Sequence, residues 1–297
     1  MSKVSDANLI KLATYSAIAV ASTLVVSKTY AWYLTGSLSI QASLIDSLLD
    51  TFASLLNCVA VYHALRPADA EHRFGHGKAE ALASLGQSIF IAISAGWLLK
   101  EVIKRLYQPE PLTYSTFAVM VMTSATALTF ILVLGQRYVI KRTQSLAVSS
   151  DSLHYQTDLL SNIGVLVSFY LSSYFNVSYF DTGVGALISI YLLYSTGVIA
   201  RKAFDILMDR ELAKEVIEKI TRIAQSHHKV LGIHDLRTRS SGHTEFVQMH
   251  LDLDKNMSLY HAHIIADEVA AEINKIYPNA QVIIHQDPVT VDSEKFF

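Results

Sequence analysis

Six long apolar stretches put the strongest limit on what this chain can fold into. A helix needs about 20 mostly apolar residues to cross the hydrocarbon layer of a membrane. Six segments reach that length when a few polar residues are tolerated, at residues 10–34, 38–64, 80–106, 114–140, 150–174 and 178–205. Hydrophobic residues make up 51% of the chain and charged residues only 17%, which favours a membrane protein in contact with lipid. The sequence therefore predicts an all-α transmembrane domain of six helices over residues 1–206.

The pattern changes in the last third of the chain, which is hydrophilic and amphipathic. Helical spacing or strand-like alternation of apolar residues marks, in order, residues 212–223, 233–239, 244–254, 258–277 and 280–286. The order is helix, strand, strand, helix, strand, with one face of the sheet covered by helices. We therefore expect a C-terminal α+β cytoplasmic domain over residues 207–297, metallochaperone-like in its layout.

Basic residues indicate how the chain is oriented in the membrane. Ten of them fall on one side, at the chain start, in the second-to-third and fourth-to-fifth linkers and at the entrance to the tail. Three fall near the opposite side, namely Lys100, Lys104 and Arg105. By the positive-inside rule the side with ten is cytoplasmic, so both termini of this multi-pass protein are expected in the cytoplasm.

Composition excludes two classes of site. A net charge of −2 at pH 7 offers no basic patch for nucleic acid. The single cysteine, Cys58, lies in an apolar stretch, so the chain has neither a disulfide framework nor a cysteine-based zinc site. Any metal must be held by carboxylates and imidazoles.

Two of the apolar stretches carry such groups at helical spacing. Asp46 and Asp50 lie four apart in the second stretch, and His154 and Asp158 lie four apart in the fifth. Residues four apart share a helix face, so each helix presents two side chains that can bind metal. An acid at the centre of a membrane helix costs about 2.5 to 3.5 kcal/mol on insertion scales. These groups therefore need a partner.

A divalent cation is the simplest partner for them. Lys28 would serve only if its side chain fails to extend to the nearer membrane interface. Three carboxylates and one imidazole supply four ligands, the number that tetrahedral Zn²⁺ takes, and the same set suits other divalent transition metals. Taken singly, each acid is as readily a hydrogen-bonded structural group. Two pairs on separate helices favour a metal site.

The second-to-third linker holds another group of ligand-type residues. Asp69, His72 and His76 are spaced three and four apart, within reach of one ion if the segment turns helically. The alternative is a cytoplasmic loop that carries solvated polar residues. Glutamate does not follow His72, so this is not the zinc-protease motif.

The tail is also rich in histidine. His250 lies on the strand face opposite the apolar residues of 244–254, and His285 and Asp287 lie two apart, on one side of an extended chain. This arrangement suits a metal site on an open sheet face.

The two spaced pairs, Asp46-x-x-x-Asp50 and His154-x-x-x-Asp158, occur with six helices and an α+β tail. Together they resemble the cation diffusion facilitators over essentially the whole chain, most closely the bacterial zinc and ferrous-iron efflux members. The resemblance implies a homodimer in the bacterial inner membrane that exports a divalent cation in exchange for protons. It implies that these four residues form the transport site.

The resemblance also extends to the other two clusters. Family members bind a second metal in the linker that carries Asp69, His72 and His76. The cytoplasmic metal site of the bacterial members is matched by His234, His250, His263, His285 and Asp287. In the folded tails of two subunits such a site would regulate the pump according to the cytoplasmic metal level.

The function predicted from these features is secondary transport rather than catalysis. Because ligands must lose protons to bind metal, protons compete with the metal and act as the counter-ion. Zn²⁺ is the preferred transported and regulatory ion, with Cd²⁺ or Fe²⁺ as alternatives, since the Irving–Williams order leaves selectivity to geometry and availability. Two other functions stay open: an intramembrane metal-dependent enzyme and a metal sensor that does not transport.

Overall fold

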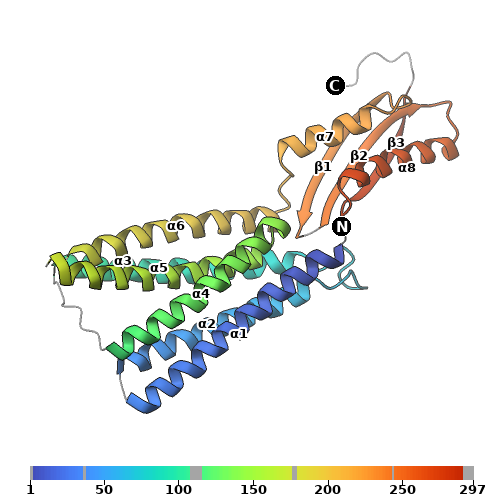
Figure 1. Cartoon of the computed structure of the whole chain (residues 1–297). Coiled ribbons are helices and arrows are strands. Elements are labelled where there is room, and N and C mark those ends of the chain that lie inside the picture. The colour runs from blue at the N-terminus through green and yellow to red at the C-terminus, as the bar shows by residue number, and fades with distance from the viewer. Residues whose placement is uncertain (1–2, 36–37, 108–115, 176–178, 243, 290–297) are drawn as a thin grey trace. The chain divides into compact units, whose positions relative to one another are not determined.

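The chain forms two compact units, Met1–Phe204 and Asp205–Phe297. The computed structural model describes residues 3–35, 38–107, 116–175, 179–242 and 244–289. Some side chains within the helices are outside this description, and that of Asp46 is one of them. Figure 1 shows the first unit as long helices packed side by side and the second as a small sheet with helices α7 and α8.

Six long helices make up the first unit, as the apolar stretches predict. Their bounds are α1 Lys3–Thr35, α2 Leu38–Ala64, α3 Lys78–Tyr107, α4 Thr116–Thr143, α5 Leu146–Phe175 and α6 Tyr179–Leu207. Within the described residues, four segments are long and apolar enough to cross a membrane, namely Asp6–Leu34, Lys78–Lys104, Thr123–Thr143 and Gly185–Leu207. They belong to α1, α3, α4 and α6.

The helices pack through small and polar residues and turn apolar ones outward. α1 contacts α2 and α4, and α5 contacts α2, α3 and α4. Ala17 and Ala21 of α1 are fully buried, which allows neighbouring helices to approach closely. Ser84 and Ser150 are also buried, whereas Trp97 and many leucines and isoleucines are exposed. A soluble protein shows the reverse arrangement.

A buried carboxylate ties α3 to the start of α5. Glu80, only 4% exposed, accepts hydrogen bonds from the Ser145 hydroxyl at 2.6 Å and the Ala147 N–H at 3.0 Å. The first N–H groups of a helix have no partner within it, and a carboxylate there satisfies them and the helix dipole. Glu80 therefore fixes the beginning of the helix that carries His154.

The tail has the predicted order of elements. It contains α7 Lys214–Gln225, β1 Gly232–Ser241, β2 Thr244–Asp254, α8 Leu259–Ile276 and β3 Gln281–Val289. The strand order is β1-β2-β3, with β1 antiparallel and β3 parallel to β2. Val247, Met249, Leu251 and Leu253 of β2 pack against apolar residues of α7 and α8. The alternate residues of β2 lie on the other face of the sheet.

Candidate metal centres

The side chains of Asp50, His154 and Asp158 meet between α2 and α5. Nε2 of His154 lies 2.8 Å from Oδ1 of Asp50, and one ligand atom from each of the three residues lies within 4.8 Å of the others. His154 is buried, and the two carboxylates are partly buried. The structure thus brings together three of the four predicted ligands; Asp46, the fourth, is on α2 with its side chain outside the described part of the chain.

A buried polar network supports this cluster. Asp151, which is fully buried, accepts hydrogen bonds from Gln136 Nε2 at 2.7 Å and from the Ser54 hydroxyl at 3.3 Å. The hydroxyls of Ser54 and Tyr155 lie 2.8 Å apart, and Tyr155 also donates to the Ala17 carbonyl at 3.3 Å. Hydrogen bonds to buried polar groups of this kind fix side-chain positions. The network therefore joins α1, α2 and α4 to the turn of α5 just before His154.

Sequence analysis overlooked Asp151, although the signal was present. Asp151, His154 and Asp158 are spaced three and four apart, so all three share one face of α5. Reading the helix for polar residues at positions i−3 and i−4 from a predicted ligand would have found it.

The linker residues Asp69, His72 and His76 also form a group. Asp69 lies 3.3 Å from Nδ1 of His72 and 3.2 Å from Nε2 of His76, and the two rings are 4.6 Å apart at their centroids. The segment is not helical, contrary to the condition set by the spacing. Instead, Asp69 Oδ1 accepts hydrogen bonds from the backbone of His72 and Glu71. Gly75 then adopts φ +81°, a conformation that glycine tolerates best.

The backbone hydrogen bonds of this linker segment also lower the pKa of Asp69. The backbone N–H of His72, followed by that of Glu71 and by the nearby imidazoles, holds the pKa of the Asp69 carboxyl below its ordinary value. The carboxylate is therefore ionised at neutral pH and open to solvent, a suitable ligand for a cation from the aqueous side.

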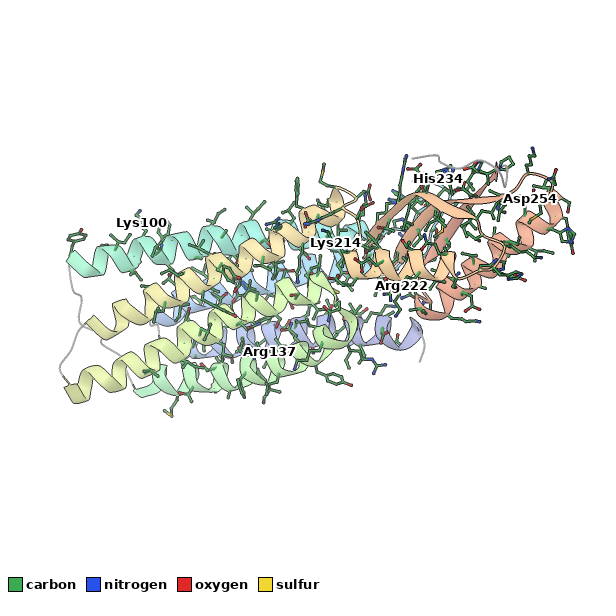
Figure 2. The ribbon with its side chains drawn as sticks, turned by 90° about the horizontal axis from the view of Figure 1, so that it is seen from above. Lys100, Arg137, Lys214, Arg222, His234 and Asp254 are labelled. Atoms are coloured by element: carbon green, nitrogen blue, oxygen red, sulfur yellow. The ribbon has the colours of Figure 1, made fainter. Side chains whose placement is uncertain are left out.

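In the tail, strand pairing brings three histidines into one row across the sheet. His234 of β1 is the partner of His250 of β2, which is in turn the partner of His285 of β3. Asp252 and Asp287 form the next row on the same face, since residues two apart on a strand share a face. This face is opposite the core, and Figure 2 shows His234 on the side of the sheet away from α7.

Asp287 is the hub of this group. Its oxygens lie 2.7 Å from Nδ1 of His250, 3.2 Å from Nε2 of His234 and 3.3 Å from Nε2 of His285. The hydrogen bond with His250, with the nearby imidazoles, keeps the pKa of the Asp287 carboxyl below its ordinary value. His234, His250 and Asp287 place ligand atoms within 4.8 Å of one another.

Two acids that sequence analysis did not predict border this group. Asp252 Oδ1 lies 3.3 Å from Nδ1 of His234, and a side chain at Gly232 would collide with the Asp252 carboxylate. Asp235 lies 3.9 Å from His250, at an irregularity in β1 where its φ is +47°. Pairing register would have found Asp252, but no pattern in the sequence marks the irregularity.

His263 is not part of the tail group within one chain. It lies on α8, which packs on the core face of the sheet, and its side chain is 68% exposed beside Asp267 at 3.5 Å. The predicted tail set therefore divides into four residues that meet on the sheet and one that does not.

Comparisons with known proteins match both units. The model of the cation efflux transmembrane domain matches residues 14–208, and that of the cation efflux protein cytoplasmic domain matches residues 212–289. Cation-efflux pump FieF of Klebsiella pneumoniae is 45% identical over 97% of this chain and 95% of that protein. FieF of Escherichia coli O1:K1 is 44% identical over the same shares. A solved chain of CzrB in its zinc form shares 28% identity over 29% of this chain and 99% of its own, with a TM-score of 0.27, which adds nothing to the fold described above.

Proposed function

The chain belongs to the cation efflux family of transporters, also called cation diffusion facilitators, and we propose that it is a proton-coupled antiporter that exports divalent transition-metal cations from the cytoplasm. Family membership makes it a transporter and not an enzyme, so the intramembrane-enzyme alternative is dropped. A metal sensor that does not transport is one outcome of the test below.

The observation that carries the proposal is the group formed by Asp50, His154 and Asp158. These residues come from two long helices of the transmembrane unit and place ligand atoms within 4.8 Å of one another. Asp46 completes the proposed set. Carboxylates inside a membrane domain are costly unless compensated, and a divalent cation compensates two of them at once. The four residues are thus the proposed binding site of the transported ion.

The same ligands account for coupling to protons. A carboxylate or imidazole must be deprotonated to bind metal, so metal and protons exclude each other from the site. If α2 and α5 move against the other helices, a site that faces the two sides alternately exchanges the two kinds of cation. The site contains no thiolate, which suits release of the ion on the far side.

Zn²⁺ is the proposed principal substrate. The two relatives named above are called cation-efflux pumps, a name that specifies no particular metal. A set of three carboxylates and one imidazole binds Zn²⁺ with four ligands and also accepts Fe²⁺ or Cd²⁺. Flux measured ion by ion decides among them.

The other two groups are proposed to bind metal without transporting it. The linker group of Asp69, His72 and His76 and the tail group of His234, His250, His285 and Asp287 are exposed or partly exposed to solvent. Occupancy of such sites follows the free metal in the cytoplasm. His263 is proposed to contribute from the second chain of a homodimer, since the tail matches a family domain that is named for dimerisation.

We place the chain in the bacterial inner membrane with all six helices spanning it. The apolar outer surface of the first unit suits lipid. The excess of basic residues at one end of the helices supports a cytoplasmic location of both termini and of the tail.

Proteoliposomes test the proposal directly. The wild-type protein is expected to accumulate Zn²⁺ when a pH gradient is imposed, because protons leaving the vesicle drive the exchange. Asp50→Ala is expected to reduce the initial rate at least about 100-fold, since the site loses a charged ligand and the partner of His154.

Glu101→Gln serves as the matched control. Glu101 is also an acid on a long helix, but it pairs with Lys104 near the end of α3. The zinc flux of the Glu101→Gln variant is therefore expected to equal that of wild type. Zinc loading that is equal with and without the gradient would contradict antiport. Binding without any flux would favour a sensor.

A further inference from the structure

Lys28 is a charged residue inside a membrane-length helix. It lies within the apolar segment Asp6–Leu34 of α1. Ala17, Ala21 and Ala31 are buried on that helix, and Lys28 continues the same series at a spacing of seven from Ala21 and three from Ala31. Its side chain is itself partly buried. Lys28 therefore lies on the face of α1 that packs against other helices, rather than on the lipid face.

A hydrogen bond holds the ammonium group of Lys28 in that position. Its Nζ donates to the hydroxyl of Ser47 on α2 at 2.7 Å, and Ser47 is only 2% exposed. A lysine in a membrane helix commonly extends its side chain to the nearer interface. The bond to a buried serine of a second helix keeps this positive charge inside the bundle.

Ser47 lies next to the proposed transport site along α2. Ser47, Asp50 and Ser54 are spaced three and four apart and share one face of the helix. Asp50 meets His154 from this face, and Ser54 contacts Asp151 and Tyr155 from it. Residues three apart on a helix have Cβ atoms about 5–6 Å apart. The Ser47 hydroxyl that accepts from the ammonium is therefore on a residue one helical turn from Asp50, on the same face of α2.

The charges of the site show what this neighbour contributes. The proposed ligand set has three carboxylates and one imidazole, so a bound divalent cation leaves one negative charge uncompensated. A net charge within a membrane domain is unfavourable. The ammonium of Lys28 supplies one positive charge that offsets the negative charge left over by the four ligands.

We propose that Lys28 is a permanent counter-charge of the transport site, a positioning residue that limits how tightly the divalent ion is held and so allows it to leave. The inference rests on the proposed function and deepens it. Over a separation on the order of 5–8 Å at an effective dielectric constant of about 20, one unit charge alters the affinity for a divalent cation more than tenfold. Without Lys28, the ion binds more tightly and departs more slowly.

The test is zinc uptake by the full chain in proteoliposomes as a function of zinc concentration. Lys28→Gln, which removes the charge and keeps a polar side chain, is expected to lower KM and kcat together, each at least about fivefold. Lys28→Arg retains the charge and is expected to stay within about twofold of wild type in both. Lys100→Gln is the matched control: Lys100 is a lysine of α3 that lies 5.0 Å from the Trp97 ring, and its removal leaves KM and kcat unchanged.

The direction of the change in KM separates an electrostatic role from a structural one. A lysine that only supports packing would raise KM or reduce the yield of folded protein when replaced, and either an unchanged or a raised KM in Lys28→Gln overturns the proposal. Should that variant fail to fold, Ser47→Ala takes its place, because it removes the hydrogen bond that holds the ammonium of Lys28 on α2. A smaller fall in KM is then expected, and an unchanged KM overturns the inference.

Asp50→Ala, measured in the same series, keeps the two proposals distinct. If Asp50→Ala retains full flux, the proposed transport site is wrong. If Asp50→Ala loses flux while Lys28→Gln behaves as wild type, only the role of Lys28 is wrong.

Discussion

The group on α2 and α5 and the group on the tail sheet use the same donors in opposite surroundings. In the helical unit, the side chain of His154 is 9% exposed and its partners are aspartates from two helices. In the tail, His234 is 51% exposed at its side chain and lies in a row of histidines on an open sheet face. A buried group must have its charge compensated at all times, whereas an exposed one is compensated by water. Under the proposed function, burial, more than ligand type, is what separates the site that carries the ion from the site that senses it.

The strongest way to break this comparison is to remove one histidine from each group. His154→Ala is expected to reduce zinc flux about 100-fold or more at any zinc concentration, because no solvent replaces a buried ligand. His250→Ala is expected to keep the flux at saturating zinc within about twofold of wild type and to alter its response to low zinc. Initial rates in proteoliposomes measure both. Equal losses of saturating flux in the two variants would show that the groups do not differ in role.

A second test sharpens the description of the tail group. Asp287 contacts all three histidines of the row, so Asp287→Ala is expected to weaken zinc binding by the tail about 10- to 100-fold. Calorimetric titration measures it in a chain in which Asp50→Ala has disabled the helical site. Asp267→Ala is the control, since Asp267 pairs with His263 on α8 and not with the row. If both variants bind zinc alike, Asp287 is not the hub.

The smallest expected effect is the loss, at acid pH, of the stability that Asp287 contributes to the tail sheet. The pKa of Asp287 is held below its ordinary value by His250, so its contribution to stability is present above about pH 4 and is lost as the pH falls further. Hydrogen exchange of β2 and β3, corrected for intrinsic rates, is expected to separate wild type from Asp287→Asn equally at pH 7 and pH 5. The difference should shrink only below about pH 4. A difference that has already vanished at pH 5 would contradict the lowered pKa.

Asp287 is expected to stay ionised between pH 7 and pH 5, so protonation of its carboxylate does not account for any zinc release from the tail in that range.

Sequence predicted the elements well because periodicity is a local property. The six apolar stretches and the alternation in 244–254 correspond to α1–α6 and β2. It also predicted which helical pairs would meet, since Asp50 and the pair of His154 and Asp158 each needed a partner in an apolar environment. The four-residue spacing within each helix and the cost of an unpartnered acid in an apolar helix were enough for this prediction.

Sequence could not predict what depends on chain geometry between elements. The φ of +81° at Gly75 brings His72 and His76 to Asp69 without a helix. The irregularity in β1 brings Asp235 near His250. Both features depend on the local backbone conformation, which leaves no periodic signal in the sequence.

Anomalous diffraction at the zinc edge, from crystals of the full chain grown with Zn²⁺, tests the central claim most directly. We expect a peak between α2 and α5 with Asp50, His154 and Asp158 at about 2.0–2.2 Å from it, in addition to any peaks at the linker and tail groups. Peaks confined to the linker and the tail, with none between α2 and α5, would contradict the proposal that these helices hold the transported ion.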